Sequence, residues 1–544
     1  MGQQNCCELV NKQQNQITQD DIDNYKFDKL DYSRPSTYKK LESIATEITT
    51  TGILILAGGK NMRYDQTKIK SLTPLDIPSQ KNMFQLIAEK ITKLNLIASN
   101  GKDTQSTQIQ VYVMTTDDHF IEVKEYWKKN NFFGIDKSCI TFFLQSTFPV
   151  LDLQGQILMK KQYEAQLSPN GPADFFPALL SFGILKKMLK QKIKYLHIVG
   201  VENILLKPLD PLLLGYAKLQ DKDFICKVVD RSPNDNDAQF FVQRSDDTVK
   251  VVTNQEIIQY LENTKSSQKN TNNNINNIQK QQNLSDAPVF MHNLVVKTDF
   301  LNQIAGDPGK KYKLAQQFHV IKRSLDWYDW ESQSILQPQQ PNAYIFERQI
   351  GDMIALTGID KVKLLKVNRT EEYSPIIYPL GIYSPEEAKT DLSNLHKKWL
   401  GLDERNYLES QILEISPLVS YNGEQLDPYI SLIQNVKQLQ FPLHIQSYQQ
   451  LQHEIQQMKM QQSQNGKSQT QHKQQQQQIQ QQLQQNKVYQ QKYNESQNQS
   501  LRNSSKYQIN NASTYHNNNN NSNKNSSYQV TRKNSNVSTK QQQK

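Results

Sequence analysis

Long hydrophobic runs are missing from this chain of 544 residues. No apolar stretch approaches the roughly 20 residues that a membrane-spanning helix needs, so we expect no transmembrane segment. The first 50 residues also lack the apolar core of a secretory signal peptide. Cysteine is scarce as well, and Cys6, Cys7, Cys139 and Cys226 form neither a disulfide framework nor a metal-binding pattern. The sequence therefore predicts a protein of a reducing compartment, the cytoplasm.

Excess charge is lacking from most of the chain. Residues 451–544 contain twelve Lys or Arg and two Asp or Glu, a net charge of +10 that equals the net charge of the whole chain. Residues 1–450 are therefore neutral overall. A basic tail beside a neutral body gives no reason to expect a nucleic-acid partner. The nine histidines are scattered without the spacing of a zinc site.

The N-terminus carries a candidate modification motif. Gly2 follows the initiator, and Cys6 and Cys7 lie close behind it. This arrangement resembles an N-myristoylation site at Gly2 with palmitoylation sites at Cys6 and Cys7. Two or three acyl chains would hold the protein on a membrane surface, whereas one binds only marginally. Cys6 stands where the usual motif has Ser or Thr, so an unmodified, disordered N-terminus is the alternative.

Hydrophobic patterning divides the chain into four parts. Residues 1–50 predict a polar, helical arm, and residues 51–380 alternate strands with helices, which indicates an α/β domain with a mixed, Rossmann-like sheet. Residues 262–284 are almost entirely polar and predict a disordered insertion. Residues 381–448 form a small C-terminal region that begins with a capped helix at Ser384-Pro385. Residues 449–544 are rich in Gln and Asn and predict a disordered tail, in which only an isolated helix within the Gln run is compatible with the composition.

The stretch from Gly52 to Lys70 is the strongest candidate for a binding site. Residues 53–56 predict a strand buried on both faces. The strand ends at Gly58-Gly59, where bare backbone can approach a ligand closely, and Arg63 and Lys70 follow. Fixed cations beyond a glycine turn at the carboxyl end of a strand indicate a site for an anionic ligand. A plain strand-to-loop turn is the alternative on these residues alone.

Further motifs follow this stretch in order along the chain. Together with it, the series is Leu56-Ala57-Gly58-Gly59 with Arg63 and Lys70, Pro78-Ser79-Gln80-Lys81, Val111 to Thr116, Phe142-Phe143-Leu144-Gln145, Ser168-Pro169-Asn170-Gly171, Val201-Glu202-Asn203, Lys227-Val228-Val229-Asp230, Pro341-Asn342, Glu347, and Arg369 with Glu372-Tyr373-Ser374-Pro375. These motifs, over roughly residues 52–400, resemble the eukaryotic UDP-N-acetylglucosamine pyrophosphorylase family.

The resemblance implies a nucleotide-diphospho-sugar transferase fold and a reaction in which a sugar 1-phosphate attacks the α-phosphorus of UTP and pyrophosphate leaves. It implies Mg²⁺ as the cofactor, held with the help of Glu202, and UTP and a sugar 1-phosphate as partners. The implied roles are catalytic for Arg63 and Lys70, nucleotide-binding for Ala57, Gly58, Gly59, Gln145 and Gly171, and substrate-binding for Glu347 and Arg369.

Several family positions are changed here. The family's Gly-Asn-Gly-Gly is Gly171-Pro172-Ala173-Asp174, and two lysines that the family places near the sugar phosphate are Ile345 and Ile377. Lost cations leave phosphate charge less compensated, which predicts weak activity. Two further readings stay open: an enzyme for a different sugar 1-phosphate, such as one without the N-acetyl group, and a catalytically weak or inactive relative acting as a membrane-associated nucleotide-binding or scaffold protein.

Overall fold

The computed structural model describes residues 50–61, 65–98, 109–236, 238–243, 249–254, 256, 258, 287–402, 410–434, 436 and 439–507. Arg63, the lipidation candidates Gly2, Cys6 and Cys7, most of the N-terminal arm and the expected insertion at 262–284 lie outside the described residues.

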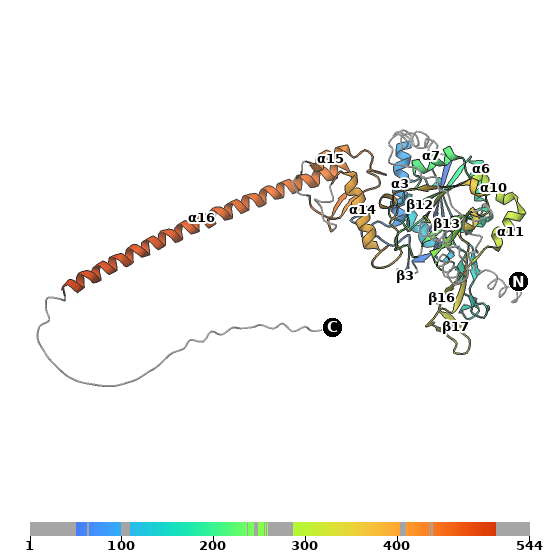
Figure 1. The fold of residues 1–544 in the computed structure, drawn as a ribbon, viewed down its shortest axis with the longest axis horizontal. Coiled ribbons are helices and arrows are strands. Elements are labelled where there is room, and N and C mark those ends of the chain that lie inside the picture. The colour runs from blue at the N-terminus through green and yellow to red at the C-terminus, as the bar shows by residue number, and fades with distance from the viewer. Residues whose placement is uncertain are drawn as a thin grey trace, which may run out of the picture. The chain divides into compact units, whose positions relative to one another are not determined.

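A mixed sheet forms the centre of the main domain, as the alternating pattern predicts (Figure 1). Its order is β14-β13-β15-β11-β1-β4-β5, with β12 between β15 and β20. The strand β1 runs parallel to both its neighbours, β4 and β11, and β15 runs antiparallel to β11. The strands are β1 Thr51–Leu56, β4 Gln110–Thr115, β5 Ile140–Leu144, β11 Tyr195–Gly200, β12 Phe224–Val229, β13 Gln239–Gln243, β14 Val249–Thr253, β15 Val289–Lys297 and β20 Val362–Lys366.

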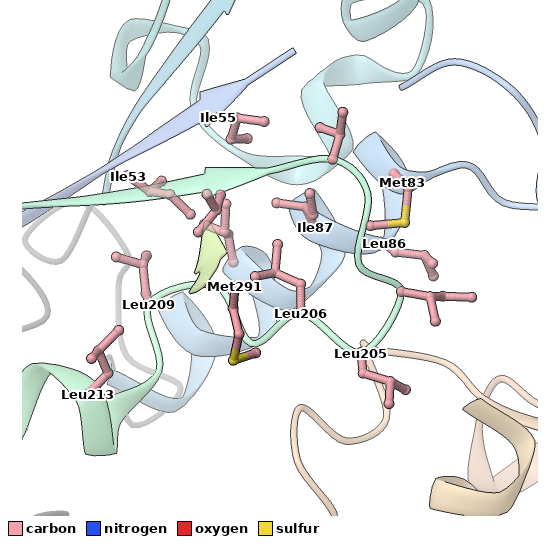
Figure 2. Close-up of a cluster of buried hydrophobic side chains, with 14 of the residues drawn as sticks. Ile53, Ile55, Met83, Leu86, Ile87, Leu205, Leu206, Leu209, Leu213 and Met291 are labelled. Carbon is pink, nitrogen blue, oxygen red and sulfur yellow. The ribbon is translucent and has the colours of Figure 1, made fainter. Parts of the chain in front are cut away.

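Helices cover both faces of this sheet, which is why its central strands are apolar on both sides. Ile53 and Ile55 of β1 pack on one face and Leu54 on the other. Figure 2 shows Ile53 and Ile55 with Ile87 of α3 and Leu206 in the first of these clusters. The first face is covered by α3 Met83–Ala98, α4 Asp117–Lys129 and α7 Pro211–Gln220, and the second by α5 Phe175–Ser181, α6 Ile184–Lys190, α10 Thr298–Gly306 and α12 Ile350–Ile354.

Residues 177–190 have apolar side chains at helical spacing, but the structure divides the segment into two helices. The helix α5 ends at Ser181, and α6 begins at Ile184. Gly183 between them has a φ of +67°, which glycine adopts without steric cost and which no residue inside an α-helix has. The apolar spacing continues through the break because both short helices pack on the same face of the sheet.

Short strands beside the main sheet form a small β subdomain. It contains β6 Thr147–Pro149, β7 Leu151–Asp152, β8 Met159–Lys161, β9 Glu164–Ala165, β10 Leu167–Pro169, β16 His319–Arg323, β17 Trp327–Asp329, β18 Ser334–Leu336 and β19 Ala343–Glu347. Ile345 of β19 is buried in an apolar cluster with Val150, Leu158 and Ala343. An apolar environment at position 345 agrees with the replacement of the family's lysine by isoleucine there.

The C-terminal region has a hydrophobic cluster of its own. It is built on α14 Pro385–Trp399, the parallel pair β21 Leu413–Ile415 and β22 Leu443–Ile445, and α15 Asp427–Gln434. Ser384 caps α14 as predicted, since its side chain accepts a hydrogen bond from the backbone of Glu387. Glu414 of β21 is buried against the main domain and accepts hydrogen bonds from the backbone and the hydroxyl of Ser79, both at 2.7 Å.

The beginning of the expected tail is helical. Helix α16 spans Tyr448–Tyr507. Leu451, Ile455 and Met458 in its first turns are buried, so the compact part of the chain extends to Lys459 and includes residues that we expected to be disordered. Residues 508–544 lie outside the described part of the chain. Within the described residues, no helix is both long and apolar enough to cross a bilayer.

The remaining strands and α-helices of the described residues are short. They are the pair β2 Lys60–Asn61 and β3 Asp65–Ile69, the helix α11 Pro308–Gln316 after α10, and the single turn α13 Arg369–Glu372.

Candidate functional site

The carboxyl edge of the parallel strands collects most of the predicted site residues. The strands β5, β4, β1 and β11 are mutually parallel, so their carboxyl ends lie at one edge of the sheet. Gln145 follows β5, Ala57 follows β1, and Glu202 comes shortly after β11. In open α/β sheets this edge is where ligands bind.

The loop after β1 presents backbone to this edge. Ala57 donates its N–H to the carbonyl of Met114, which fixes the start of the loop against β4. Gly58 is confined, because a Cβ on it would lie 2.6 Å from Oε1 of Gln145. Gly59 has a φ of +149° and no atom within 4 Å of its Cβ position. The loop is thus packed on one side and open on the other, as a backbone ligand site requires.

Gln145 links this loop to a second one. Its backbone N–H donates to the carbonyl of Thr115, and its Nε2 donates to the carbonyl of Gly171 over 2.6 Å. Gly171 itself touches the end of β19, because a Cβ there would lie 2.9 Å from Cβ of Glu347. The structure therefore brings together four of the predicted residues, Gly58, Gln145, Gly171 and Glu347, from four separate segments.

Lys70 and Glu202 form an ion pair at the same edge. Lys70 Nζ lies 2.6 Å from Glu202 Oε1, and the side chains are 18% and 49% exposed. The predicted catalytic cation and the predicted metal carboxylate are therefore in contact, although 132 residues separate them in the chain. Both remain accessible to a ligand.

Arg369 lies on the α13 turn and is held by protein groups. Its guanidinium pairs with Asp235 at 2.6 Å, donates to the carbonyl of Asp230 and to the hydroxyl of Tyr383, and stacks over Tyr373. Burial lowers the pKa of Arg369, but the hydrogen bond and charge of Asp235 outweigh it and raise the pKa overall. These contacts hold the guanidinium of Arg369 in a fixed position. Its partner Asp235 was not among the residues predicted for the site.

A buried network of charged side chains joins β12 to α13 near this edge of the sheet. Lys227 of β12 pairs with Asp210 at 2.5 Å and with Glu372 of α13, and its side chain is fully buried. Burial alone would lower the pKa of Lys227, but these two carboxylates raise it. Asn203 accepts from the N–H of Ser374 and donates to the carbonyl of Glu372. A lysine inside the apolar run of β12 was the sequence signal for this network.

A divalent metal would have one carboxylate within easy reach here. Among the described residues, no group of three or more His, Cys, Asp or Glu could hold a metal ion by itself. Glu202 is half-exposed at the ligand edge, which suits Mg²⁺, because this ion is commonly bound by one or two carboxylates together with substrate phosphates and water. The residues present therefore fit an Mg²⁺ ion that Glu202 and the phosphates of a ligand would bind together.

This edge, with its glycine loop, fixed amide and accessible cation–carboxylate pair, is the arrangement expected of an α/β protein whose ligand site lies at the carboxyl ends of parallel strands. The chain belongs to the UTP–glucose-1-phosphate uridylyltransferase family, whose model matches residues 4–304. The structural neighbours described next are UDP-sugar pyrophosphorylases, which confirms the predicted nucleotide-diphospho-sugar transferase fold.

Relatives and solved structures agree with this placement. A Dictyostelium discoideum protein named a probable UDP-N-acetylglucosamine pyrophosphorylase is 31% identical over 411 residues, which cover 72% of this chain and 80% of the relative. A crystal structure from Entamoeba histolytica, assigned as UDP-N-acetylglucosamine pyrophosphorylase, is 25% identical, with a TM-score of 0.60 over 75% of this chain and 96% of that one. The UDP-N-acetylglucosamine pyrophosphorylase of Trypanosoma brucei, at 21% identity and a TM-score of 0.62, has the same fold over 78% of this chain and 85% of its own.

Proposed function

We propose that this enzyme transfers a uridylyl group from UTP to a sugar 1-phosphate, forming UDP-N-acetylglucosamine or a related UDP-sugar and releasing pyrophosphate. Family membership gives the reaction type. The observation that carries the proposal is the Lys70–Glu202 pair, which lies at the carboxyl edge of the parallel strands that Gly58 and Gln145 also border.

Lys70 is the described cation that would act on the phosphates. In this reaction, negative charge grows on the pyrophosphate as it leaves, and an aligned cation stabilises that charge more than it stabilises the ground state. Lys70 is positioned by Glu202, so it keeps its orientation before the nucleotide binds. Arg63, which lies outside the described residues, is proposed as a second phosphate ligand on the strength of the family motif.

Glu202 is the residue that would hold Mg²⁺ together with the nucleotide phosphates. The ion would supply Lewis-acid neutralisation of phosphate charge. Binding of a cation at Glu202 would release Lys70 from its pair, so that the ammonium could turn to a phosphate oxygen. Lys70 would thus exchange one anionic partner for another.

The uracil would lie against the glycine loop and Gln145. Because Gln145 Nε2 donates to Gly171, its Oε1 is the atom that faces Gly58. An amide oxygen accepts a hydrogen bond, and the N3–H of uracil is a donor. The backbone of Ala57, Gly58 and Gly59 would supply the remaining polar contacts to the base.

Glu347 and Arg369 are proposed for the sugar end. Glu347 ends β19 beside Gly171, and its carboxylate accepts from Gln349 at 3.2 Å. Arg369 would reach a substrate only through N–H positions that Asp235, Asp230 and Tyr383 leave available. Ile345 and Ile377 are the two lysine replacements that would leave the sugar phosphate with less positive charge around it.

The test is a comparison of two lysine variants in uridylyl transfer with N-acetylglucosamine 1-phosphate and glucose 1-phosphate. Lys70→Ala should lower kcat by about a hundredfold, because it removes a cation that acts on the departing charge. Lys297→Ala is the matched control. Lys297 pairs with Asp221 at the same 2.6 Å and is 19% exposed, but it lies at the opposite edge of the sheet.

The outcomes separate the possibilities. The proposal requires turnover by the wild type, a large loss in Lys70→Ala and little change in Lys297→Ala. Equal activity of the wild type and Lys70→Ala would show that the phosphate site is elsewhere. If the wild type neither catalyses the reaction nor binds UTP in the presence of Mg²⁺, the result would favour a scaffold protein over an enzyme. The ratio of the two sugar rates identifies the preferred sugar.

A further inference from the structure

A buried ion pair that the family motif does not contain lies directly behind the proposed uracil site. Asp174 is fully buried, and its carboxylate accepts hydrogen bonds from three segments. The donors are the backbone N–H of Ser146 at 2.6 Å, Nδ2 of Asn170 at 3.3 Å and the guanidinium of Arg348 at 2.9 Å. A glycine at this position, as in the family's Gly-Asn-Gly-Gly, could make none of the side-chain contacts.

Arg348 is fixed by its backbone as well as by its charge. Its N–H donates to the carbonyl of Asn170 over 2.6 Å, and its carbonyl accepts from the N–H of Ala173 over 3.1 Å. Its guanidinium also lies 4.4 Å from the ring centroid of Phe318. Residues 170–174 and the end of β19 are therefore held together at several points. We call the Asp174–Arg348 pair and these contacts the loop clamp.

Gly171 lies at a close approach between the two segments. Its φ is +86°, and a Cβ on it would lie 2.6 Å from the carbonyl oxygen of Arg348. Glycine is therefore required here both by conformation and by space. The clamp, together with a hydrogen bond from the backbone N–H of Asp174 at 3.1 Å, holds the carbonyl oxygen of Gly171 in place.

That carbonyl orients the amide of Gln145. Nε2 of Gln145 donates to it, which leaves Oε1 on the side of Gly58. If the carbonyl moved, the amide could rotate and present its NH₂ group instead, exchanging an acceptor for a donor. Uracil carries N–H at N3, whereas cytosine carries an acceptor at N3, so the two orientations favour different bases.

We propose that the loop clamp of Asp174 and Arg348 is a positioning device that fixes the amide of Gln145 and thereby determines the preference for uracil over cytosine. This inference rests on the proposed function, because it assigns the uracil to Gln145. Neither Asp174 nor Arg348 touches the base in this account. Both act through the carbonyl of Gly171.

The test measures binding of UTP and of CTP in Mg²⁺ by isothermal titration. Arg348→Met removes the charge but keeps a long side chain and every backbone contact. We expect UTP to bind about tenfold more weakly and CTP to change little, because a misaligned or unpaired hydrogen-bonding group at a base edge typically costs about a factor of ten. Asp174→Asn, which is nearly isosteric, should shift the ratio of UTP affinity to CTP affinity in the same direction. This variant provides the test if Arg348→Met does not fold. Arg348→Lys, which keeps the positive charge, should retain most of the wild-type preference for UTP over CTP.

A matched control separates positioning from stability. Lys81 and Glu89 form another largely buried ion pair, at 2.7 Å, on α3 and the segment before it. Lys81→Met should lower the melting temperature but leave the UTP/CTP ratio as in the wild type. If Arg348→Met and Asp174→Asn also lower only the melting temperature, the clamp is merely structural and the inference is wrong. If the wild type binds neither nucleotide, the proposed function fails first, and the inference fails with it.

Discussion

Buried histidines give the core a built-in sensitivity to acid. His197 of β11 is fully buried between two polar partners. Its Nδ1 accepts from the N–H of Leu209 at 2.8 Å, so its Nε2 carries the hydrogen and donates to Oδ1 of Asn293 at 2.7 Å. Burial lowers the pKa of His197 to about 4, and the charge of Lys227 contributes in the same direction. The neutral ring therefore satisfies both partners, whereas a protonated ring would lose its acceptor.

Protonation of His197 should weaken the fold between pH 6.5 and 4. The folded pKa lies below the unfolded value of 6.5, so the unfolded state binds the proton more readily and stability is lost as the pH falls through this window. The full effect is about 3 kcal/mol, since one pKa unit corresponds to about 1.4 kcal/mol. Chemical denaturation at pH 7, 6 and 5 should show the free energy of unfolding falling with pH. In His197→Gln, this slope should be smaller by the contribution of one proton.

His453 provides the comparison. It lies exposed on α16, so His453→Gln removes a histidine without altering the core. A slope that His197→Gln and His453→Gln change equally would mean that His197 does not carry the acid sensitivity. His396, whose pKa burial lowers to about 3, would contribute a second proton and remains in both variants.

At the scale of elements, α16 combines two environments in one helix. Leu451, Ile455 and Met458 lie on one side at helical spacing and are buried, and Leu451 and Ile455 belong to the cluster of the C-terminal region. From Met460 onward the helix belongs to a second structural unit of the chain. Apolar side chains in this part, such as Ile479 and Leu483, are exposed. Gln and Lys have good helix propensity, so the composition permits a helix where it does not permit a packed domain.

Removing one anchor of α16 should destabilise the C-terminal region. Ile455→Ala should lower the free energy of unfolding by about 2–4 kcal/mol, because it leaves a cavity in a packed cluster. Ile479→Ala, on the exposed part of the same helix, should change it by less than about 0.5 kcal/mol. Urea denaturation of both variants measures the difference.

Truncation gives an independent check of where the packed part of the chain ends. A chain ending at Lys459 keeps Leu451, Ile455 and Met458 and should retain the stability of the full chain. A chain ending at Tyr448 should lose stability because it lacks all three side chains. Equal stability of the two truncated chains would place the boundary before α16.

On the scale of the whole molecule, the N-terminus raises the question of where the enzyme works. We propose that Gly2 is acylated and that Cys6 or Cys7 carries a second acyl chain, which would hold the catalytic domain on a membrane surface. The motif supports the proposal, and these residues lie outside the described part of the chain.

The Gly2→Ala variant tests this attachment. It should move the protein from the membrane pellet to the supernatant, because myristate is transferred only to an N-terminal glycine. Gln4→Ala, two residues away, is the control and should stay in the pellet. An intact mass that shows a bare N-terminus in the wild type would argue against acylation, as would a membrane fraction unchanged by Gly2→Ala.

The sequence by itself determined the fold class, the family and most element positions. The strand β1 includes residues 53–56, where the buried apolar run predicted a strand, and Ser384-Pro385 marked the start of α14. These features are encoded by neighbouring residues, because strand burial, capping and helix spacing are local patterns.

Only the tertiary structure decided which distant side chains meet. Lys70 reaches Glu202, and Asp174 reaches Arg348 across 174 residues, because the sheet order and the loop crossing at Gly171 bring them together. The same packing buries Ile345, although the motif placed that position near a phosphate. Long-range contacts of this kind depend on strand register and loop closure, which the local pattern around either residue does not specify.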